Sequence, residues 1–480
     1  MNRRMVLYTV GTVIKLEALL MLLPTVCALI YKESCVKALL ISIALSLAAG
    51  FALTLISRPG NKVIYAREGF ITVALAWIAL SAFGALPFYI SGEIPSYIDA
   101  FFETASGFTT TGASILTDVE AMSRGLLFWR SFTHWVGGMG VLVFIMAIVP
   151  SISDRNIHLL RAEVPGPIVG KLVPRMKETT RILYIIYLAL TALMFLLLLA
   201  GGMPVFDSIV HSIGTAGTGG FGIKADSIGS YSPYIQWVVA IFMLIFGVNF
   251  NVYYLILLRK FKPVFKSGEL WFYIGVVALS TITITANVSP MFGSLSESLR
   301  HSTFQVATVI STTGFSTVDF NQWPGLSKMV LFLLMFTGGC AGSTAGGFKL
   351  TRVLILLKNI KRELKKLLHP RSVNALKFEG KRLDENTVSS VGTYLSIYVF
   401  FLCGTLFLLS FEPFDFETNV TAAVACFNNI GPGLGAVGPA ASFAEYSPFA
   451  KVILSFAMLF GRLEIYPLFI ALSPSTWMKK

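Results

Sequence analysis

Four short stretches of this sequence combine a glycine with small, hydroxyl or amide residues, and they lie between strongly apolar segments. We call them glycine loops 1 to 4, and they are Thr110-Thr111-Gly112-Ala113, Thr218-Gly219-Gly220-Phe221, Thr312-Thr313-Gly314-Phe315 and Asn429-Ile430-Gly431-Pro432. A dehydrated cation in a membrane needs oxygen atoms that replace its water, and rings of backbone carbonyls supply them. Carbonyls can face inward only where the backbone leaves the helix, which glycine permits at little steric cost. The loops therefore predict a cation site in one four-sided pore.

A short helix is expected before each glycine loop. Residues that favour a helix N-terminus begin these helices, namely Tyr97-Ile98-Asp99, Phe206-Asp207-Ser208, Ser294-Leu295-Ser296-Glu297 and Asp415-Phe416-Glu417-Thr418. The helices would direct the negative ends of their macrodipoles toward the loops, which favours a cation over an anion. Close helix packing around small residues is the alternative, and it explains any one loop but not four equivalent ones. Because the glycines recur about every hundred residues, the sequence indicates an internal repeat of that length.

Length and composition place the chain in the membrane class. It has 480 residues, of which 55% are hydrophobic and 13% charged, and a mean hydropathy of +0.73. A helix needs about 20 apolar residues to cross a membrane. The segments that meet this length are 6–31, 37–57, 69–91, 126–150, 182–202, 233–258, 268–290, 326–357, 391–411 and 447–472.

The predicted fold class is an all-α polytopic membrane protein. Four span–pore-loop–span repeats surround one pseudo-fourfold central pore, and an N-terminal two-helix hairpin precedes them. The predicted units are the accessory hairpin 1–68 and the pore repeats 69–150, 182–260, 268–368 and 389–480. Arg3 and Arg4 lead into an apolar run without a cleavage pattern, so the first segment is expected to be retained.

The positions of the basic residues predict the orientation. The net charge is +13, and most Lys and Arg residues lie near the two termini and in 58–67, 155–181, 259–266 and 349–382. Because basic loops stay on the cytoplasmic side, both termini are predicted to be cytoplasmic, and no nucleic-acid partner is needed to explain the charge. Acids on the predicted outer side could raise the cation concentration at an entrance. They are Glu93, Asp118, Glu120, Asp226, Asp319, Glu412 and Glu445.

The cysteines and histidines do not indicate a functional site. The five residues of each type are scattered, which supports neither a disulfide framework nor a metal cluster.

Segment 326–357 is predicted to break in its middle, because so many glycines cannot hold a stable helix. We call 338–347 the glycine-rich break, and its candidate functional residues are Gly338, Gly339, Gly342, Ser343, Thr344, Gly346 and Gly347. Its spacing fits no phosphate-binding loop, since Phe348 separates the last glycine from Lys349. It also fits no nucleophile elbow, since a glycine directly precedes Ser343. A plain kink between packed helices is the structural alternative.

Arg462 is a charge deep within segment 447–472. Such a charge is costly unless it faces a cavity or a partner. Glu464 is two residues away and faces elsewhere on a helix, which argues against a simple local pair. An electrostatic barrier to cations and a buried interhelical pair both stay open. His134, Trp135 and Asn249 are interpreted as helix-packing groups.

The glycine loops resemble the four filter loops of the Trk/Ktr/HKT cation transporter superfamily. The N-terminal hairpin and the last loop, Asn-Asn-Ile-Gly-Pro-Gly-Leu-Gly, are most similar to its TrkH branch. The resemblance implies a pore related to potassium-channel pores, with potassium as the transported ion and no organic cofactor in the chain. It further implies potassium uptake across the inner membrane, a homodimer, and a cytosolic nucleotide-binding regulatory subunit of the TrkA type.

The resemblance also assigns roles to residues. Glycine loops 1 to 4 would be the selectivity filter, the glycine-rich break would be an intramembrane gate, and Arg462 would be the arginine below the filter. Gly431 and Gly433 both fit the fourth filter place, and alignment with loop 1 favours Gly431. A serine in the first loop's glycine place accompanies sodium preference in the plant branch, so Gly112 favours potassium.

Two other functions compete with potassium uptake. The first is a sodium-coupled or sodium-permeable transporter of the same architecture. The second is a polytopic membrane enzyme that uses Ser343, His134 and an acid, which would have to converge in space. The basic stretch 358–371 is interpreted either as a solvated loop or as a docking surface for the regulatory subunit.

Overall fold

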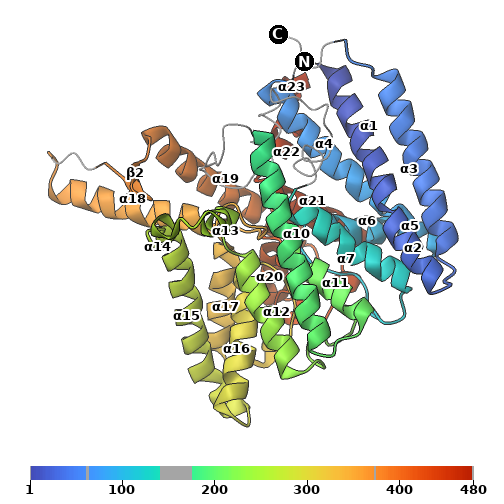
Figure 1. The fold of residues 1–480 in the computed structure, drawn as a ribbon. Coiled ribbons are helices and arrows are strands. Elements are labelled where there is room, and N and C mark those ends of the chain that lie inside the picture. The colour runs from blue at the N-terminus through green and yellow to red at the C-terminus, as the bar shows by residue number, and fades with distance from the viewer. Residues whose placement is uncertain (1, 61–63, 141–175, 372–374, 478–480) are drawn as a thin grey trace.

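The computed structural model describes residues 2–60, 64–140, 176–371 and 375–477, and these are mostly helical (Figure 1). Within them, the only sheet is an antiparallel pair of short strands, β1 (Lys377–Phe378) and β2 (Lys381–Arg382). The predicted end of segment 126–150 and the basic stretch from 155 to 175 lie outside the described residues.

An N-terminal hairpin begins the fold. Helix α1 (Arg3–Leu20) continues into α2 (Leu22–Ile30), and α3 (Val36–Ile56) packs against α1. The two helices approach closely at Gly11, where an added β-carbon would lie 2.8 Å from the Leu53 Cβ. Arg3 donates a hydrogen bond to the Trp477 carbonyl oxygen (3.0 Å). The first and last described helices therefore meet at the same end of the molecule.

After the hairpin, the same order of elements occurs four times: a long helix, a short helix, a glycine loop and a further helix. The first group holds α4 (Ala66–Gly84), α5 (Leu86–Ser91), α6 (Tyr97–Phe108) and α7 (Arg124–Gly138). The second holds α10 (Met176–Ala200), α11 (Val205–Ala216), α12 (Pro233–Phe246), α13 (Phe250–Leu257) and α14 (Phe261–Phe265). The third holds α15 (Gly268–Val288), α16 (Leu295–Ile310), α17 (Gly325–Thr337) and α18 (Leu350–Leu368). The fourth holds α19 (Glu385–Leu409), α20 (Phe416–Phe427), α21 (Pro448–Arg462), α22 (Tyr466–Leu472) and α23 (Pro474–Trp477).

The short helices alternate with the helices that follow them around a closed ring. The neighbours in contact are α6 with α7, α7 with α11, α11 with α12, α12 with α16, α16 with α17, α17 with α20, α20 with α21, and α21 with α6. Because the ring closes, the C-terminal ends of α6, α11, α16 and α20 are brought together. The glycine loops start at these ends.

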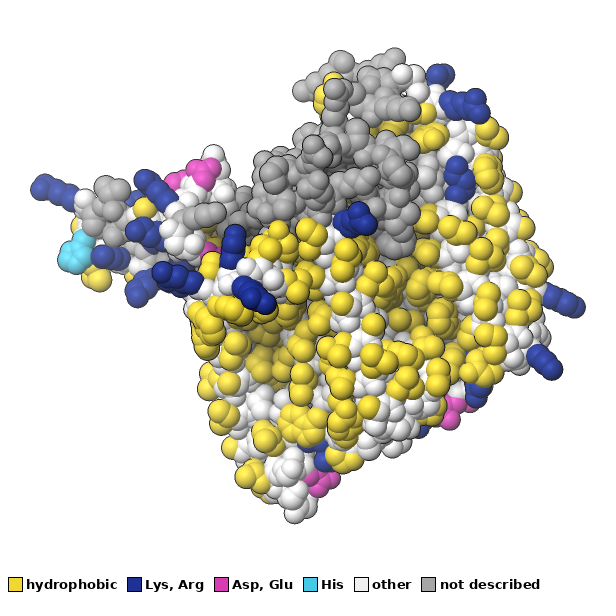
Figure 2. Space-filling model, in the orientation of Figure 1, with side chains coloured by type: hydrophobic (Ala, Val, Ile, Leu, Met, Phe, Trp, Pro, Cys, Tyr) yellow, Lys and Arg dark blue, Asp and Glu magenta, His cyan; other side chains and the backbone are white. Residues whose placement is uncertain are grey.

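The outer surface has the character of a membrane protein. Figure 2 shows apolar side chains over a broad face of the molecule, with a group of Lys and Arg near α14 and α18 and further bases around the margins of this face. Exposed apolar residues of this kind include Leu188, Leu193, Ile241, Ile274 and Leu279. An apolar outer face with charged residues around its margins is typical of a membrane-spanning bundle.

Six described segments are long and apolar enough to cross a membrane, and a bent pair adds a seventh. They are Arg3–Ile30, Val36–Ile56, Ala66–Ser91, Arg181–Ala200, Gly268–Met291 and Glu385–Leu409, with the pair Pro233–Phe246 and Phe250–Leu257. The predicted break of segment 326–357 is confirmed, since α17 ends at Thr337 and α18 begins at Leu350.

Two segments predicted as continuous spans are interrupted instead. Segment 233–258 bends by 92° between α12 and α13. The Asn249 side chain accepts the Asn251 amide hydrogen (3.0 Å) and so caps the second helix at the bend. Segment 447–472 stops at Arg462, and Glu464 and Ile465 then adopt positive φ values of 54° and 66°. A left-handed residue ends an α-helix, so α22 starts as a separate element.

Two of the four predicted caps are present, since Ser294 and Asp415 accept backbone amide hydrogens at the starts of α16 and α20. In α6 the cap is Ser96, which lies just before the predicted stretch, and it accepts the Asp99 amide hydrogen. Helix α11 differs, because Pro204 precedes it and makes no side-chain cap. Its Asp207 accepts the Tyr231 hydroxyl instead (2.7 Å). Burial and this carboxylate raise the pKa of Tyr231, which keeps the hydroxyl in its donating form.

Candidate cation pathway

Each short helix ends in the same C-terminal turn, from which its glycine loop starts. In loop 1 the Thr110 amide donates to the Gly107 carbonyl (3.1 Å), and the Thr111 amide donates to the Ser106 carbonyl (2.9 Å). This pair of bonds is the Schellman motif. Loops 2 to 4 repeat it with the amides of Thr218 and Gly219, Thr312 and Thr313, and Asn429 and Ile430. All four loops therefore leave their helices in the same way.

The backbone conformation of the loops is also the same. Left-handed φ values occur at the first residue of each loop, and they are 56° at Thr110, 55° at Thr218, 54° at Thr312 and 56° at Asn429. Such a conformation costs a residue with a side chain about 1–2 kcal/mol. The glycines two positions later are left-handed as well, with 79° at Gly112, 75° at Gly220, 94° at Gly314 and 101° at Gly431. Strain stored at four equivalent positions is characteristic of a functional site.

The four glycine loops meet in a closed ring. A β-carbon added to Gly112 would overlap the carbonyl oxygen of Gly219 in loop 2. The same overlap relates Gly220 to Thr313 in loop 3, Gly314 to Ile430 in loop 4, and Gly431 to Thr111 in loop 1. Each glycine thus faces the carbonyl that precedes the glycine of the next loop. Four equivalent carbonyls converge in this way, which is the arrangement that replaces the water of a cation.

The register of loop 4 follows from this geometry. Gly431 shares the left-handed φ and the contact with the next loop. The backbone of Gly433 is not left-handed, and a β-carbon added there would meet the side chains of Thr421 and Val437 instead. Gly431 therefore occupies the position equivalent to Gly112.

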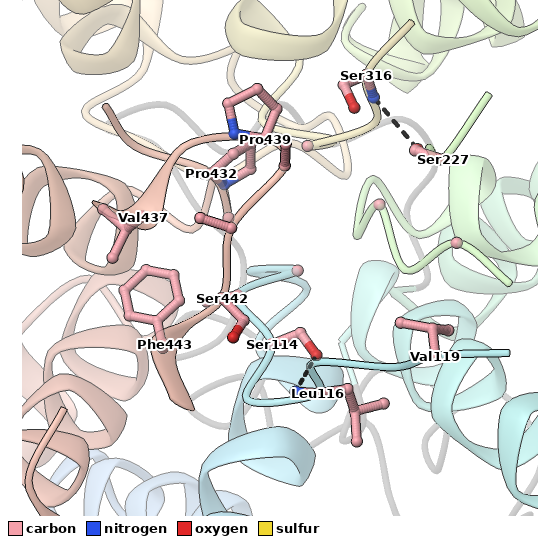
Figure 3. A pocket seen from close by; sticks show the side chains of 18 of the residues that line it. Ser114, Leu116, Val119, Ser227, Ser316, Pro432, Val437, Pro439, Ser442 and Phe443 are labelled. Atoms are coloured by element: carbon pink, nitrogen blue, oxygen red, sulfur yellow. Dashed lines mark hydrogen bonds between the residues drawn. The ribbon is translucent and has the colours of Figure 1, made fainter. Parts of the chain in front are cut away.

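The loops open onto one cavity of about 540 Å³. Gly112, Gly220, Gly314 and Gly431 all line it. Figure 3 shows its wall, to which all four groups of helices contribute through Ser114 and Leu116, Ser227, Ser316, and Pro432 and Phe443.

Few of the acids predicted on the outer side line this cavity. Among the charged residues that line it, Glu445 is the only acid, and Arg130 and Lys224 are the bases. Several of the other acids hold outer loops: Glu93 accepts the Ser123 amide, and Glu120 accepts the Ala225 amide. Of the acids named for the outer side, Glu445 lines this cavity, and their effect on the cation concentration at the entrance stays a prediction.

A buried ion pair behind loops 1 and 2 was missed by the sequence analysis. Arg130 of α7 pairs with Glu103 of α6, and both side chains are almost fully buried. Glu103 also accepts the Ser114 hydroxyl and the Ile115 amide (2.9 Å each) just beyond loop 1. Arg130 donates to the Gly222 carbonyl (3.0 Å) just beyond loop 2. The pair therefore joins the outer ends of two neighbouring loops.

Breaking this pair should destabilise the protein. Removal of one partner of a buried pair costs about 3–5 kcal/mol, because the other charge is left uncompensated. We therefore expect Glu103→Leu and Arg130→Met each to lower the thermal unfolding temperature in detergent. The double variant should recover part of the loss, since it buries no lone charge. Single variants as stable as the parent protein would contradict a structural role for the pair.

The glycine-rich break folds back beneath the loops. The Gly346 amide donates to the Thr312 hydroxyl of loop 3 (2.6 Å). A β-carbon added to Gly346 would lie 2.7 Å from the Asn428 carbonyl oxygen, next to loop 4. Left-handed φ values at Gly338, Gly342 and Gly347 allow the chain to reverse. The break is therefore a folded loop that packs against the ring of glycine loops. A plain kink between two packed helices would not need these contacts.

Arg462 connects the break to another part of the ring. Its guanidinium donates to the Thr344 carbonyl (2.8 Å) and to the carbonyls of Gly137 and Gly138 at the end of α7 (2.6 and 2.8 Å). Glu464 pairs with Arg352 of α18 instead. The expectation that Arg462 makes no local pair with Glu464 therefore holds, and the electrostatic barrier to cations stays a prediction. Arg462 is held by backbone carbonyls of the break and of α7.

The groups named for the enzyme alternative have separate hydrogen bonds. The Ser343 hydroxyl donates to the Cys340 carbonyl (2.6 Å), whereas the His134 ring bonds to the Gly107 carbonyl (2.8 Å). His134 packs against the Phe221 ring, with 4.1 Å between the ring centroids. The contacts of His134 with Gly107 and Phe221 are therefore those of a helix-packing group.

The closed helical ring, its lipid-facing surface and the converging carbonyls define an α-helical polytopic membrane protein of the ion-transporting class. Residues 35–479 match the TrkH family, which is described as cation transport proteins. The chain belongs to the TrkH family of cation transport proteins. The predicted family and the all-α polytopic fold class are thereby confirmed, and a membrane enzyme is excluded.

Individual relatives extend over nearly the whole chain. The Trk system potassium uptake protein TrkH of Salmonella typhimurium is 38% identical over 485 residues, which cover 99% of this chain and 100% of that protein. The Trk system potassium uptake protein TrkG of Escherichia coli K12 is 35% identical over 480 residues, covering 99% and 98%. The crystal structure of the potassium transporter TrkH from Vibrio parahaemolyticus matches with a TM-score of 0.90 and 33% identity, covering 100% of both chains.

Proposed function

We propose that this protein takes up potassium across the cell membrane through a filter of backbone carbonyls. The observation that carries the proposal is the closed ring of glycine loops, each with the same two left-handed residues. The filter residues would be Thr110, Thr111 and Gly112, Thr218, Gly219 and Gly220, Thr312, Thr313 and Gly314, and Asn429, Ile430 and Gly431. The names of the relatives, which are potassium uptake proteins, support potassium as the ion.

The glycine-rich break would be the gate of this pathway. Its contacts with Thr312 and Arg462 support this role, because a loop beneath the ring obstructs an ion that leaves the filter. The gate residues would be Gly338, Gly339, Gly342, Ser343, Thr344, Gly346, Gly347 and Arg462.

We also propose the membrane, the orientation and the division of the chain into units. The protein would lie in the inner membrane with both termini cytoplasmic, in line with the excess of bases in the loops on that side. The hairpin 1–68 would be accessory, and units 69–150, 182–260, 268–368 and 389–480 would each form a quarter of the pore. The recurring order of helices supports these units.

The protein would act as a homodimer with a cytosolic nucleotide-binding subunit of the TrkA type. The relatives are named as parts of a Trk system, which supports a multi-component assembly. The basic helix α18 leaves Leu357, Ile360 and Leu364 exposed, and such a face suits a protein partner. Chemical crosslinking of membranes that contain the full-length chain would test both contacts.

Ion flux separates potassium uptake from the sodium alternative. The purified full-length protein would be reconstituted into vesicles, and the flux of potassium and of sodium would be measured under the same gradients. We expect potassium flux to exceed sodium flux. Equal fluxes, or flux of potassium only when sodium is present, would favour the sodium-permeable or sodium-coupled transporter.

Shortening the glycine-rich break should raise potassium flux. A chain that joins α17 to α18 without residues 338–347 can no longer reach Thr312, so the obstruction beneath the ring is removed. The flux would be compared in vesicles with that of the full-length protein. Potassium flux that stays the same, in a variant that elutes normally in size-exclusion chromatography, would count against the gate.

A further inference from the structure

Glu269, which lies outside the glycine-rich break, hydrogen-bonds both to the break and to the helix that follows it. Glu269, near the start of α15, accepts the Ala341 amide hydrogen on its Oε1 atom (2.8 Å). The same oxygen accepts the Thr351 hydroxyl at the start of α18. Beside these bonds, the Leu350 amide donates to the Gly339 carbonyl (3.1 Å). One carboxylate oxygen therefore joins the beginning of the break to the helix that follows it.

The surroundings make this carboxylate an effective bridge. Glu269 is 4% exposed and Thr351 is 1% exposed, so water competes little for these bonds. Hydrogen bonds in a buried site are electrostatically stronger than the same bonds in water. A buried acid also needs partners to offset its lost hydration. The bridge therefore favours the folded form of the break.

The first part of the break is fixed to the bend between α12 and α13 as well. The Cys340 amide donates to the Gly247 carbonyl, and the Phe250 amide donates to the Gly342 carbonyl (3.0 Å each). The later part reaches the ring through Gly346, as described above. The end of the break joins α18, whose start is held by the Glu269 bridge, by the Leu350–Gly339 bond and by the Arg352–Glu464 pair. Movement of α18 away from the break therefore has to separate Thr351 from Glu269.

We propose that Glu269 is the positioning residue that holds the gate closed, and that opening begins when α18 withdraws Thr351 from this carboxylate. The inference rests on the proposed function of the glycine-rich break as a gate. It goes further, because it names the contact through which a force on α18 reaches the gate.

The test is the basal potassium flux of the full-length protein in vesicles without any partner. Glu269→Ala and Thr351→Val should each raise the flux at least fivefold. The conservative variants Glu269→Gln and Thr351→Ser keep an acceptor or a hydroxyl in place, so they should largely restore the low flux. The control is Glu379→Ala, which removes an exposed carboxylate that also contacts the start of α15, through the Ser267 hydroxyl (2.7 Å). It should behave like the parent protein.

The ratio of potassium to sodium permeability distinguishes a loosened gate from general damage. It should stay unchanged in Glu269→Ala, because the bridge does not touch the glycine loops. If deletion of 338–347 raises the flux but neither Glu269→Ala nor Thr351→Val does, the gate stands and the inference about Glu269 is overturned. If Glu269→Ala does not fold, the Thr351→Val and Thr351→Ser pair decides in the same way. If the parent protein carries no potassium and the deletion changes nothing, the proposed function itself fails.

Discussion

Replacing Arg462 with alanine should increase potassium flux at least tenfold in reconstituted vesicles. The guanidinium holds the break to α7 through the carbonyls of Thr344, Gly137 and Gly138. A hydrogen bond to a charged group contributes about 1.5–3 kcal/mol. Since 1.4 kcal/mol corresponds to a factor of ten in an equilibrium, loss of even one such bond shifts the gate toward its open form by about tenfold. The positive charge adds repulsion of an approaching cation, about 4 kcal/mol at 4 Å in a medium of effective dielectric constant 20.

A lysine at this position separates the two contributions. Arg462→Lys keeps the charge but loses the planar fork that reaches several carbonyls at once. Flux near that of Arg462→Ala would assign the effect to the hydrogen bonds, and flux near that of the parent protein would assign it to the charge. Arg259→Ala, which removes an exposed arginine at the end of α13, is the control and should leave the flux unchanged. An unchanged flux in Arg462→Ala would reduce Arg462 to a packing role.

The membrane spans could be predicted closely wherever a helix faces lipid. Segment 268–290 was predicted where α15 runs from Gly268 to Val288, and segment 37–57 where α3 runs from Val36 to Ile56. A span needs about 20 apolar residues in a row, and that requirement is visible in the local sequence. The bend after Phe246 and the stop after Arg462 are different, because apolar residues continue on both sides. At the first of them, Asn249 is a cap residue within an apolar run, and it is the signal that could have indicated the bend.

The glycine loops could be predicted for a related reason. Their glycines are required where a β-carbon would overlap a neighbouring carbonyl, so the requirement leaves a residue type in the sequence. The Glu103–Arg130 pair and the Glu269 bridge could not be predicted, because their partners depend on how separate helices pack. A signal for the acids exists nonetheless. Glu103 and Glu269 are carboxylates in or beside apolar segments, and such residues have partners in a membrane protein.

Gly112→Ser should lower the preference for potassium over sodium by about tenfold or more. Gly112 has a φ of 79°, which a serine adopts only with strain. Its β-carbon would also overlap the Gly219 carbonyl oxygen, one of the four that converge. That carbonyl must move, and selectivity depends on how the carbonyls surround the ion. The free energies of the two ions in the filter differ, and a loss of about 1.4 kcal/mol in that difference changes the preference for potassium tenfold.

Reversal potentials in planar bilayers with potassium on one side and sodium on the other give the permeability ratio directly. The matched control is Gly275→Ser in α15, where an added β-carbon meets no atom within 4 Å and the backbone φ is not positive. Gly275→Ser should keep the ratio of the parent protein. Since both variants add the same hydroxymethyl group, a ratio that falls only in Gly112→Ser assigns the selectivity to the ring. A ratio that is the same in both would mean that loop 1 does not discriminate between the two ions, and the ring of carbonyls would then lose its role as the filter.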